Sequence, residues 1–414
     1  MAMLRLCIGN LQIYCWFIGY FCDIIFMVDY VWNLCCTVRL LEKKGCKMEK
    51  EYIFTEDPEE EMWQTLLQFS YEANIKRYLT EHGFAVTDDL VNNISGSVLQ
   101  AYEYYSASKH TNLQIKPLLL YYGTTNLLYG ICNLLTGTIN TIQNHGMRIT
   151  PPQAGSYIGN TEITFENPGN GGVHIFLRCM GYQTDLTKYG MWTIKEMLSS
   201  VPELCSDYKK CYSEKFTNTF LLVGYNTPEG KLEKIHADDG IEVSDIISQL
   251  RKVDGFSKSY LSPVIPSNGH GIVLRHKMNG KDISQIAYSG QPYLSVAHEK
   301  QQNLLTLPQL MYMYIALFAL GSLCRYRPEI WSPFVKNDNT GEKLLIERFL
   351  HYARRLIPNY VINHIQNRNV IYSGDKYMPI NTVKMVGEHQ VREIVSNELQ
   401  KREERKVVRR VFEK

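Results

Sequence analysis

Residues 117–135 read PLLLYYGTTNLLYGICNLL, a stretch without a single charged side chain. Pro117 is favoured in the first turn of a helix, and the leucines and tyrosines that follow supply apolar surface on successive turns. Gly123 and Gly130 are seven residues apart, so they share about the same helix face, where a second helix can approach closely. The stretch therefore predicts a buried helix in a helical bundle.

Other helices are predicted on both sides of this stretch. Residues 49–79 contain an acidic segment near their start, with Thr55 as a capping residue, which predicts a helix within this range. Apolar residues recur every three or four positions over 87–108 and again over 342–361. In the last of these helices, three arginines are expected on the solvent side: Arg348, Arg354 and Arg355.

The segment 304–326 is mostly apolar and long enough to resemble a membrane span. Arg325 and Arg327 come at its end, and the neighbouring sequence is polar and rich in tyrosine. We therefore expect a helix buried inside a bundle and no stable membrane insertion. Residues 386–414 carry dense charges of both signs, which predicts a solvated helix that can dock a protein partner.

Glycine, proline and short β-branched runs replace the helical pattern in the middle of the chain. The predicted fold is mainly α with an α+β insertion: a helical bundle plus a small mixed sheet subdomain. Strands are predicted at Ile163–Phe165, Val173–Phe176, 220–225 and 272–277, and a short helix at 193–198. The expected divisions are 1–47, a helical part 48–136, the insertion 137–300, a second helical part 301–385 that packs on the first, and 386–414.

The first 47 residues differ in composition from the rest of the chain. They hold six of the eleven cysteines and five basic against three acidic residues, so they account for the whole net charge of +2. We expect a leader that is not translated, because Lys43–Lys47 can be encoded by a purine-rich stretch like a bacterial ribosome-binding site just ahead of Met48. A membrane-associated segment and a structural extension remain the alternatives.

The absence of several sequence motifs excludes several classes of function. The chain has no P-loop, no GxGxxG after a strand, no GxSxG elbow and no HExxH. Its histidines are scattered and its cysteines form no ligand spacing, so we expect neither a metal nor a cofactor. The neutral balance after residue 47 supplies no field for capturing nucleic acid, so any such binding needs a local pocket.

Two strings resemble signatures of the YaaC-like family of bacterial proteins. Residues 106–128 contain SASKHT and then IKPLLLYYGTTNLL, followed by the pair His145-Gly146, and residues 323–331 read LCRYRPEIW. The resemblance covers about 50–385 and implies a cytoplasmic bacterial protein of unassigned activity.

The Tyr-Tyr-Gly helix also resembles a helix of HEPN-type domains, a group that includes ribonucleases. These ribonucleases use an Arg-x4-6-His motif, and Arg77 and His82 match its spacing. In such an enzyme the arginine would hold a phosphate and the histidine would move a proton. The match lies on an early helix and not late in the bundle, as the family pattern requires.

The candidate ligand site combines residues from both signatures. Its cationic and hydrogen-bonding side chains could hold a phosphate, a sugar and a base. The alternative is structural: the tyrosines could bridge packed helices, and the arginines could satisfy the last carbonyls of a helix. The candidate residues are Lys109, His110, Tyr121, Tyr122, Asn126, His145, Arg325, Arg327 and Trp331.

We therefore expect a protein that binds a nucleotide, an RNA element or a protein partner on a helical scaffold. The alternatives are a HEPN-like ribonuclease and a regulatory subunit without a ligand. The sequence does not decide whether the chain is an enzyme, and it gives no oligomeric state. Loss of a nucleotide-induced thermal shift in Arg327→Ala would indicate the binding module, and loss of RNA cleavage in Arg77→Ala or His82→Ala would indicate the ribonuclease.

Overall fold

The computed structural model describes residues 3–8, 11–16, 50–227, 230–235, 241–265, 271–287, 290–300 and 303–373. The chain divides into two compact units, Met1–Met48 and Glu49–Lys414. In the first unit, β1 (Met3–Ile8) and β2 (Leu11–Trp16) pair in antiparallel fashion. No helix in the described part of the chain is long and apolar enough to span a membrane. The predicted helix at 386–414 lies outside the described residues.

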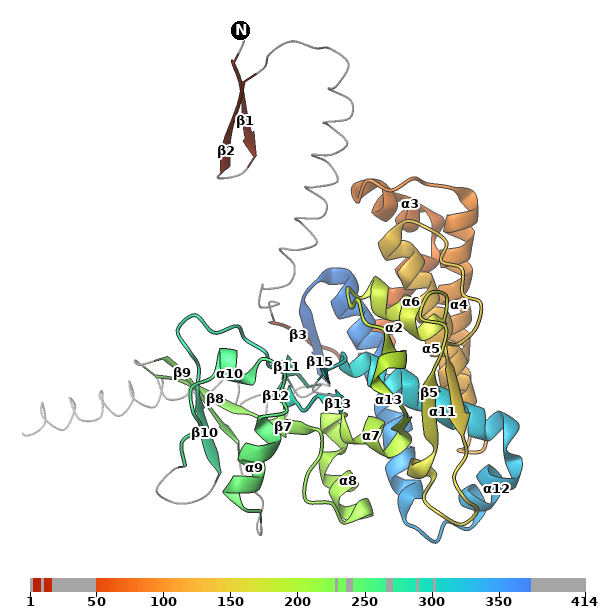
Figure 1. The fold of residues 1–414 in the computed structure, drawn as a ribbon. Helices are drawn as coiled ribbons and strands as arrows, with labels where there is room; N and C mark the ends of the chain where they lie inside the picture. Colours follow the sequence, from red (N-terminus) through yellow and green to blue (C-terminus); the bar gives the residue numbers. More distant parts are fainter. Residues whose placement is uncertain are drawn as a thin grey trace, which may run out of the picture. The chain divides into compact units, whose positions relative to one another are not determined.

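An antiparallel helix pair, α4 (Asp88–Lys109) and α5 (Lys116–Thr136), packs along its length in the helical part of the second unit (Figure 1). Both predicted helices are confirmed. A Cβ atom added to Gly123 would lie 2.7 Å from Cδ2 of Tyr105, and one added to Gly130 would lie 2.9 Å from Cβ of Ser97. The two glycines therefore allow α4 to pack directly against α5, as their spacing predicts.

The segment before α4 is broken into several elements, so the prediction of one helix within 49–79 was too simple. It contains β3 (Lys50–Phe54), α2 (Pro58–Leu67), a 3-10 turn and α3 (Glu72–Glu81). The prediction that Thr55 caps the helix was wrong. The Asp57 side chain instead accepts hydrogen bonds from the backbone N–H groups of Glu59 and Glu60, both at 3.1 Å.

The C-terminal helices return to the same core. They are α11 (Gln309–Tyr326), α12 (Pro328–Lys336) and α13 (Glu342–Gln366), followed by β15 (Asn369–Ser373). Every residue of α11 from Gln309 to Gly321 is buried, as expected for a helix enclosed by a bundle. It begins at Gln309 and not at 304, because 303–305 form a strand that pairs with 298–300. Strand β15 pairs in parallel with β3, which joins the two ends of the helical region.

Residues 147–212 pack against the same core as the helices. They contain β4 (Met147–Thr150), β5 (Glu162–Phe165), α6 (Gly172–Cys179), β6 (Trp192–Thr193), α7 (Ile194–Ser199) and α8 (Cys205–Tyr212). The predicted strand at Ile163–Phe165 and the predicted short helix are confirmed, but the predicted strand at Val173–Phe176 was wrong. It is α6, and its residues Gly172–Leu177 are all buried. A short buried apolar run carries no period that separates a strand from a helix.

A second, smaller core belongs to the mixed sheet subdomain, within 216–296. Its sheets have the strand orders β10-β9-β8 and β11-β12-β7, and α9 (Val243–Leu250) and α10 (Phe256–Ser259) contribute side chains to the same core. The strands are β7 (Thr219–Leu221), β8 (Val223–Thr227), β9 (Gly230–Ile235), β10 (Ile272–Arg275), β11 (Gln285–Ile286) and β12 (Pro292–Ser295). The fold is thus mainly α with a small mixed sheet subdomain, as the sequence predicts.

Candidate functional site

The two signature segments meet where the end of α11 lies beside α5. Arg325, in the last turn of α11, donates a hydrogen bond to the hydroxyl of Tyr122 on α5. Its guanidinium carbon lies 5.9 Å from the centre of the Tyr122 ring and 4.9 Å from that of Tyr326. Arg325 and Tyr326 are exposed. We call Tyr121, Tyr122, His145, Arg325 and Tyr326 the Arg325 cluster.

His145 is the second titratable group of this cluster. Its Nδ1 lies 2.6 Å from the hydroxyl of Tyr121. Burial raises the pKa of Tyr121, so the phenol keeps its proton, and it can donate to Nδ1 when the neutral imidazole carries its own hydrogen on Nε2. Burial lowers the pKa of His145, and the positive charge of Arg325 lowers it further. The charge of Arg325 therefore influences the protonation of His145.

Neighbouring elements hold these side chains in place. Gly321 on α11 lets the helix approach α5, since a Cβ atom there would lie 3.3 Å from Cβ of Tyr121. The carbonyl of His145 accepts a hydrogen bond from the N–H of Val173, at the start of α6, over 3.1 Å. The Phe318 ring lies 5.6 Å from the Tyr121 ring and 5.5 Å from the His145 ring, both between centroids. The cluster is thus mounted on rigid, packed elements.

Three other predicted site residues have structural partners of their own. Arg327 lies 3.4 Å from the carboxylate of Glu329. Trp331 is fully buried and its Nε1 donates to the carbonyl of Gln114 over 3.0 Å. The Asn126 side chain donates to the carbonyl of Tyr122, one turn earlier on its own helix.

Lys109 and His110 lie at the end of α4. Lys109 approaches Glu59 to 3.7 Å, and His110 ends the helix and is exposed. No hydrogen bond or ion pair between described residues joins either side chain to the cluster. Glu59 also pairs with Arg354, at 3.2 Å.

The prediction that Arg354 and Arg355 face solvent was therefore wrong. The Arg354 side chain is only 18% exposed, and it pairs with Glu59. Arg355 donates to the carbonyl of Tyr372 over 3.0 Å, which ties α13 to β15. Arg348 is exposed, as predicted.

Arg77 and His82 each have a partner on their own helix, α3. Arg77 donates to Asn74 over 3.0 Å, while His82 ends α3 with its Nδ1 2.8 Å from the carbonyl of Tyr78. The His82 ring also stacks on the Tyr78 ring, with 4.0 Å between centroids. Each side chain has a local partner, so this geometry lends no support to a ribonuclease.

A protein-family model described as YaaC-like Protein matches residues 58–365. The chain belongs to the YaaC-like family. No curated protein and no solved structure matches it. The resemblance to HEPN-type domains thus has no support from these comparisons, and the bacterial source and the cytoplasmic location stay predictions.

The matched YaaC-like region includes a buried charge that the sequence analysis missed. Glu342, in the first turn of α13, is fully buried and accepts hydrogen bonds from the N–H groups of Ile158 and Gly159, at 2.5 and 2.6 Å, and from the Tyr212 hydroxyl. Burial raises the pKa of Glu342, whereas these three donors lower it. No sequence signal pointed to it, because its partners lie more than a hundred residues away.

A second missed group lies in the sheet subdomain of this YaaC-like chain. Glu233 on β9 is fully buried, its Oε2 accepts from the Tyr260 hydroxyl at 2.6 Å, and Nε2 of His276 lies 3.0 Å from the same oxygen. Among the described residues, no group of three or more histidine, cysteine or acidic side chains could hold a metal ion.

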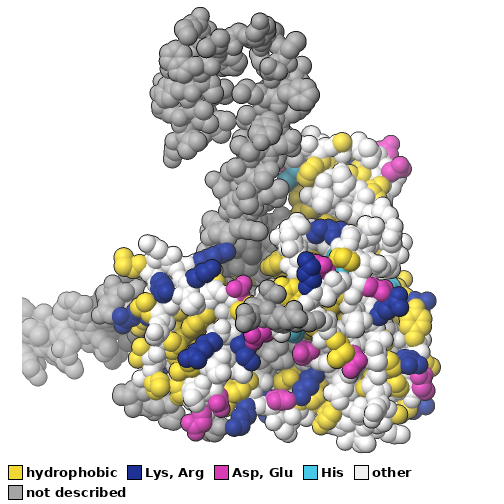
Figure 2. Space-filling model, viewed as in Figure 1, with side chains coloured by type: hydrophobic (Ala, Val, Ile, Leu, Met, Phe, Trp, Pro, Cys, Tyr) yellow, Lys and Arg dark blue, Asp and Glu magenta, His cyan; other side chains and the backbone are white. Residues whose placement is uncertain are grey.

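The surface charges of the YaaC-like protein agree with its neutral composition. On the face shown in Figure 2, Lys and Arg side chains are interspersed with Asp and Glu and with apolar side chains. Recognition of an anion on this face therefore depends on individual side chains and not on a broad field.

Proposed function

We propose that this protein binds a nucleotide, free or within an RNA, at the Arg325 cluster. The observation that carries the proposal is the state of Arg325 itself. It is exposed, and its contacts among the described residues are aromatic rings and a phenol, not a carboxylate. Arg327, two residues later, has the carboxylate of Glu329 for a partner.

The chemistry of the cluster suits a phosphate joined to a flat ring. Guanidinium groups bind phosphate through paired N–H donors, and the two rings beside Arg325 hold its plane in place. Tyr326 has 63% of its surface exposed, which leaves a face on which a base can stack. The Nε2–H of His145 supplies one further donor, and an arriving phosphate favours its protonated form.

Calorimetric titration of the full chain with a panel of nucleotides and a short single-stranded RNA tests the proposal. A nucleotide should bind, and its nucleoside should bind at least about tenfold more weakly, since loss of a charge-assisted hydrogen bond costs about 1.5–3 kcal/mol. Arg325→Ala should weaken binding by the same factor, whereas Arg327→Ala should not.

Two results would contradict the proposal. One is the absence of binding by every nucleotide and by the RNA, which with copurification of a protein would indicate an interaction subunit. The other is equal binding of nucleotide and nucleoside, since the phosphate would then contribute nothing.

A further inference from the structure

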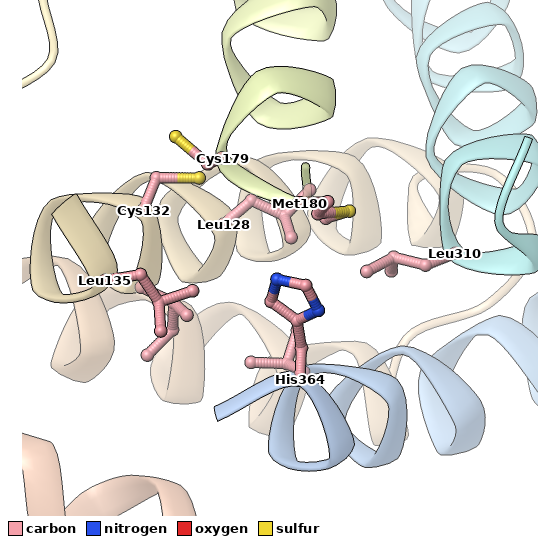
Figure 3. Close-up of a pocket in the computed structure, with 9 residues that line it drawn as sticks. Leu128, Cys132, Leu135, Cys179, Met180, Leu310 and His364 are labelled. Carbon is pink, nitrogen blue, oxygen red and sulfur yellow. The ribbon is translucent and has the colours of Figure 1, made fainter. Parts of the chain in front are cut away.

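A small apolar pocket lies between α5, α6, α11 and α13, away from the residues of the Arg325 cluster. Figure 3 shows Cys132 of α5 and Cys179 of α6 side by side at one edge, with the ring of His364 of α13 across from them. The lining residues are Leu128, Ile131, Cys132, Leu135, Cys179, Met180, Leu310, Val361 and His364.

The two cysteines are free thiols in different environments. Cys132 is buried, whereas Cys179 is only partly buried. The neighbouring Cys132 thiol lowers the pKa of Cys179, burial opposes this change, and the positive charge of Arg178 lowers the pKa further. Burial raises the pKa of Cys132. One sulfur is thus suited to react first and the other to follow.

The remaining cysteines in the described part of the chain lack this combination. Burial raises the pKa of Cys205 and of Cys324, and it raises the pKa of Cys211 to about 11. The Cys205 sulfur has the hydroxyls of Thr217 and Thr219 as neighbours, at 3.3 and 2.9 Å, and among the described residues its hydrogen bonds go to these hydroxyls and not to a second thiol. Cys205 therefore serves as a matched control.

We propose that Cys179 is an oxidation site for hydroperoxides and that Cys132 resolves it to a disulfide joining α5 and α6. In the first step, the Cys179 thiolate attacks one oxygen of hydrogen peroxide and the O–O bond breaks. The leaving hydroxide takes up a proton and departs as water, and Cys179 becomes a sulfenic acid. The peroxide is reduced and the sulfur is oxidised by two electrons.

In the second step, the Cys132 sulfur attacks the Cys179 sulfur. The S–S bond forms, the S–O bond breaks, and the departing hydroxide takes the Cys132 proton and leaves as water. The disulfide closes a covalent loop through α5 and α6, and such a loop raises the melting temperature by restricting the unfolded chain. The same α6 holds the backbone of His145 at its first turn, although the proposal does not depend on ligand binding there.

Peptide mapping of the full chain after brief treatment with hydrogen peroxide tests this proposal. Trypsin separates the two thiols, because Cys179 falls in the peptide 179–188 and Cys132 in the peptide 110–148. We expect these two peptides to become joined at low peroxide, with recovery of both after reduction. Cys179 should react at least about tenfold faster than Cys205.

Two variants separate the steps. In Cys132→Ala, a sulfenic acid should accumulate at Cys179 and be captured by dimedone, whereas Cys179→Ser should abolish the linked peptide and Cys205→Ser should leave it unchanged. The proposal is overturned if Cys179 reacts no faster than Cys205, or if it becomes overoxidised in the unaltered chain without linking to Cys132. A linked peptide that appears without any rise in the melting temperature would overturn the predicted stapling of α5 to α6.

Discussion

Glu342 and Arg325 each carry a charge that suits the helix end where it lies, but they differ in burial and in partners. Glu342 lies in the first turn of α13 and Arg325 in the last turn of α11, so each charge complements the dipole of its helix. Glu342 is fully buried and has three hydrogen-bond donors, whereas Arg325 is exposed among aromatic rings. The first charge is satisfied by the fold, and the second is the one that we propose holds a ligand.

The largest effect is expected at the buried charge. Glu342→Gln places an amide NH2 group against N–H and O–H donors, so at least one buried donor loses its acceptor. We expect the free energy of unfolding to fall by about 3 kcal/mol in urea denaturation. Glu347→Gln, at an exposed position of the same helix, is the matched control and should change it by less than about 0.5 kcal/mol. Equal stability of the two variants would refute a structural role for Glu342.

A smaller loss of stability is expected when only one of the three donors is removed. Tyr212→Phe keeps the ring in place but deletes the hydroxyl that bonds Glu342. The expected decrease in the free energy of unfolding is about 1–2 kcal/mol, again by urea denaturation. Tyr71→Phe, at a 66% exposed side chain, should have no measurable effect. A decrease in Tyr212→Phe as large as in Glu342→Gln would mean that the backbone donors contribute little.

The smallest effect is expected on the pKa of His145, which the charge of Arg325 influences. In the folded protein the positive charge of Arg325 disfavours protonation of His145, so Arg325→Ala should raise the pKa of His145 toward its ordinary value. NMR titration of the imidazole measures this shift. Arg327→Ala, in which the lost charge was already paired with Glu329, should leave the pKa nearly unchanged. An unchanged or lowered pKa of His145 in Arg325→Ala would contradict an electrostatic interaction between the two side chains.

The elements with a clear period were predictable from the sequence. The three- and four-residue rhythm located α4, and the spacing of Gly123 and Gly130 correctly indicated the face of α5 that α4 covers. Prediction failed at α6, since a short and wholly buried apolar run has no polar face to give its period. It failed again at Thr55, because Asp57, two residues later, offers a competing cap.

The candidate site was only partly predictable. Both signature strings were located, and Arg325, Tyr122, Tyr121 and His145 do meet in space. The role of each arginine could not be read from the sequence, because Arg325 and Arg327 differ only in their neighbours in the fold. Glu342 was missed for the same reason, since its three partners come from distant segments.

Calorimetric titration of one nucleotide into the unaltered chain, Arg325→Ala and Arg327→Ala tests the central claim most directly. The unaltered chain and Arg327→Ala should bind with similar affinity, while Arg325→Ala should bind at least about tenfold more weakly. Binding that survives in Arg325→Ala, or that is lost equally in both variants, would contradict the proposal that the exposed arginine beside Tyr122 holds the ligand.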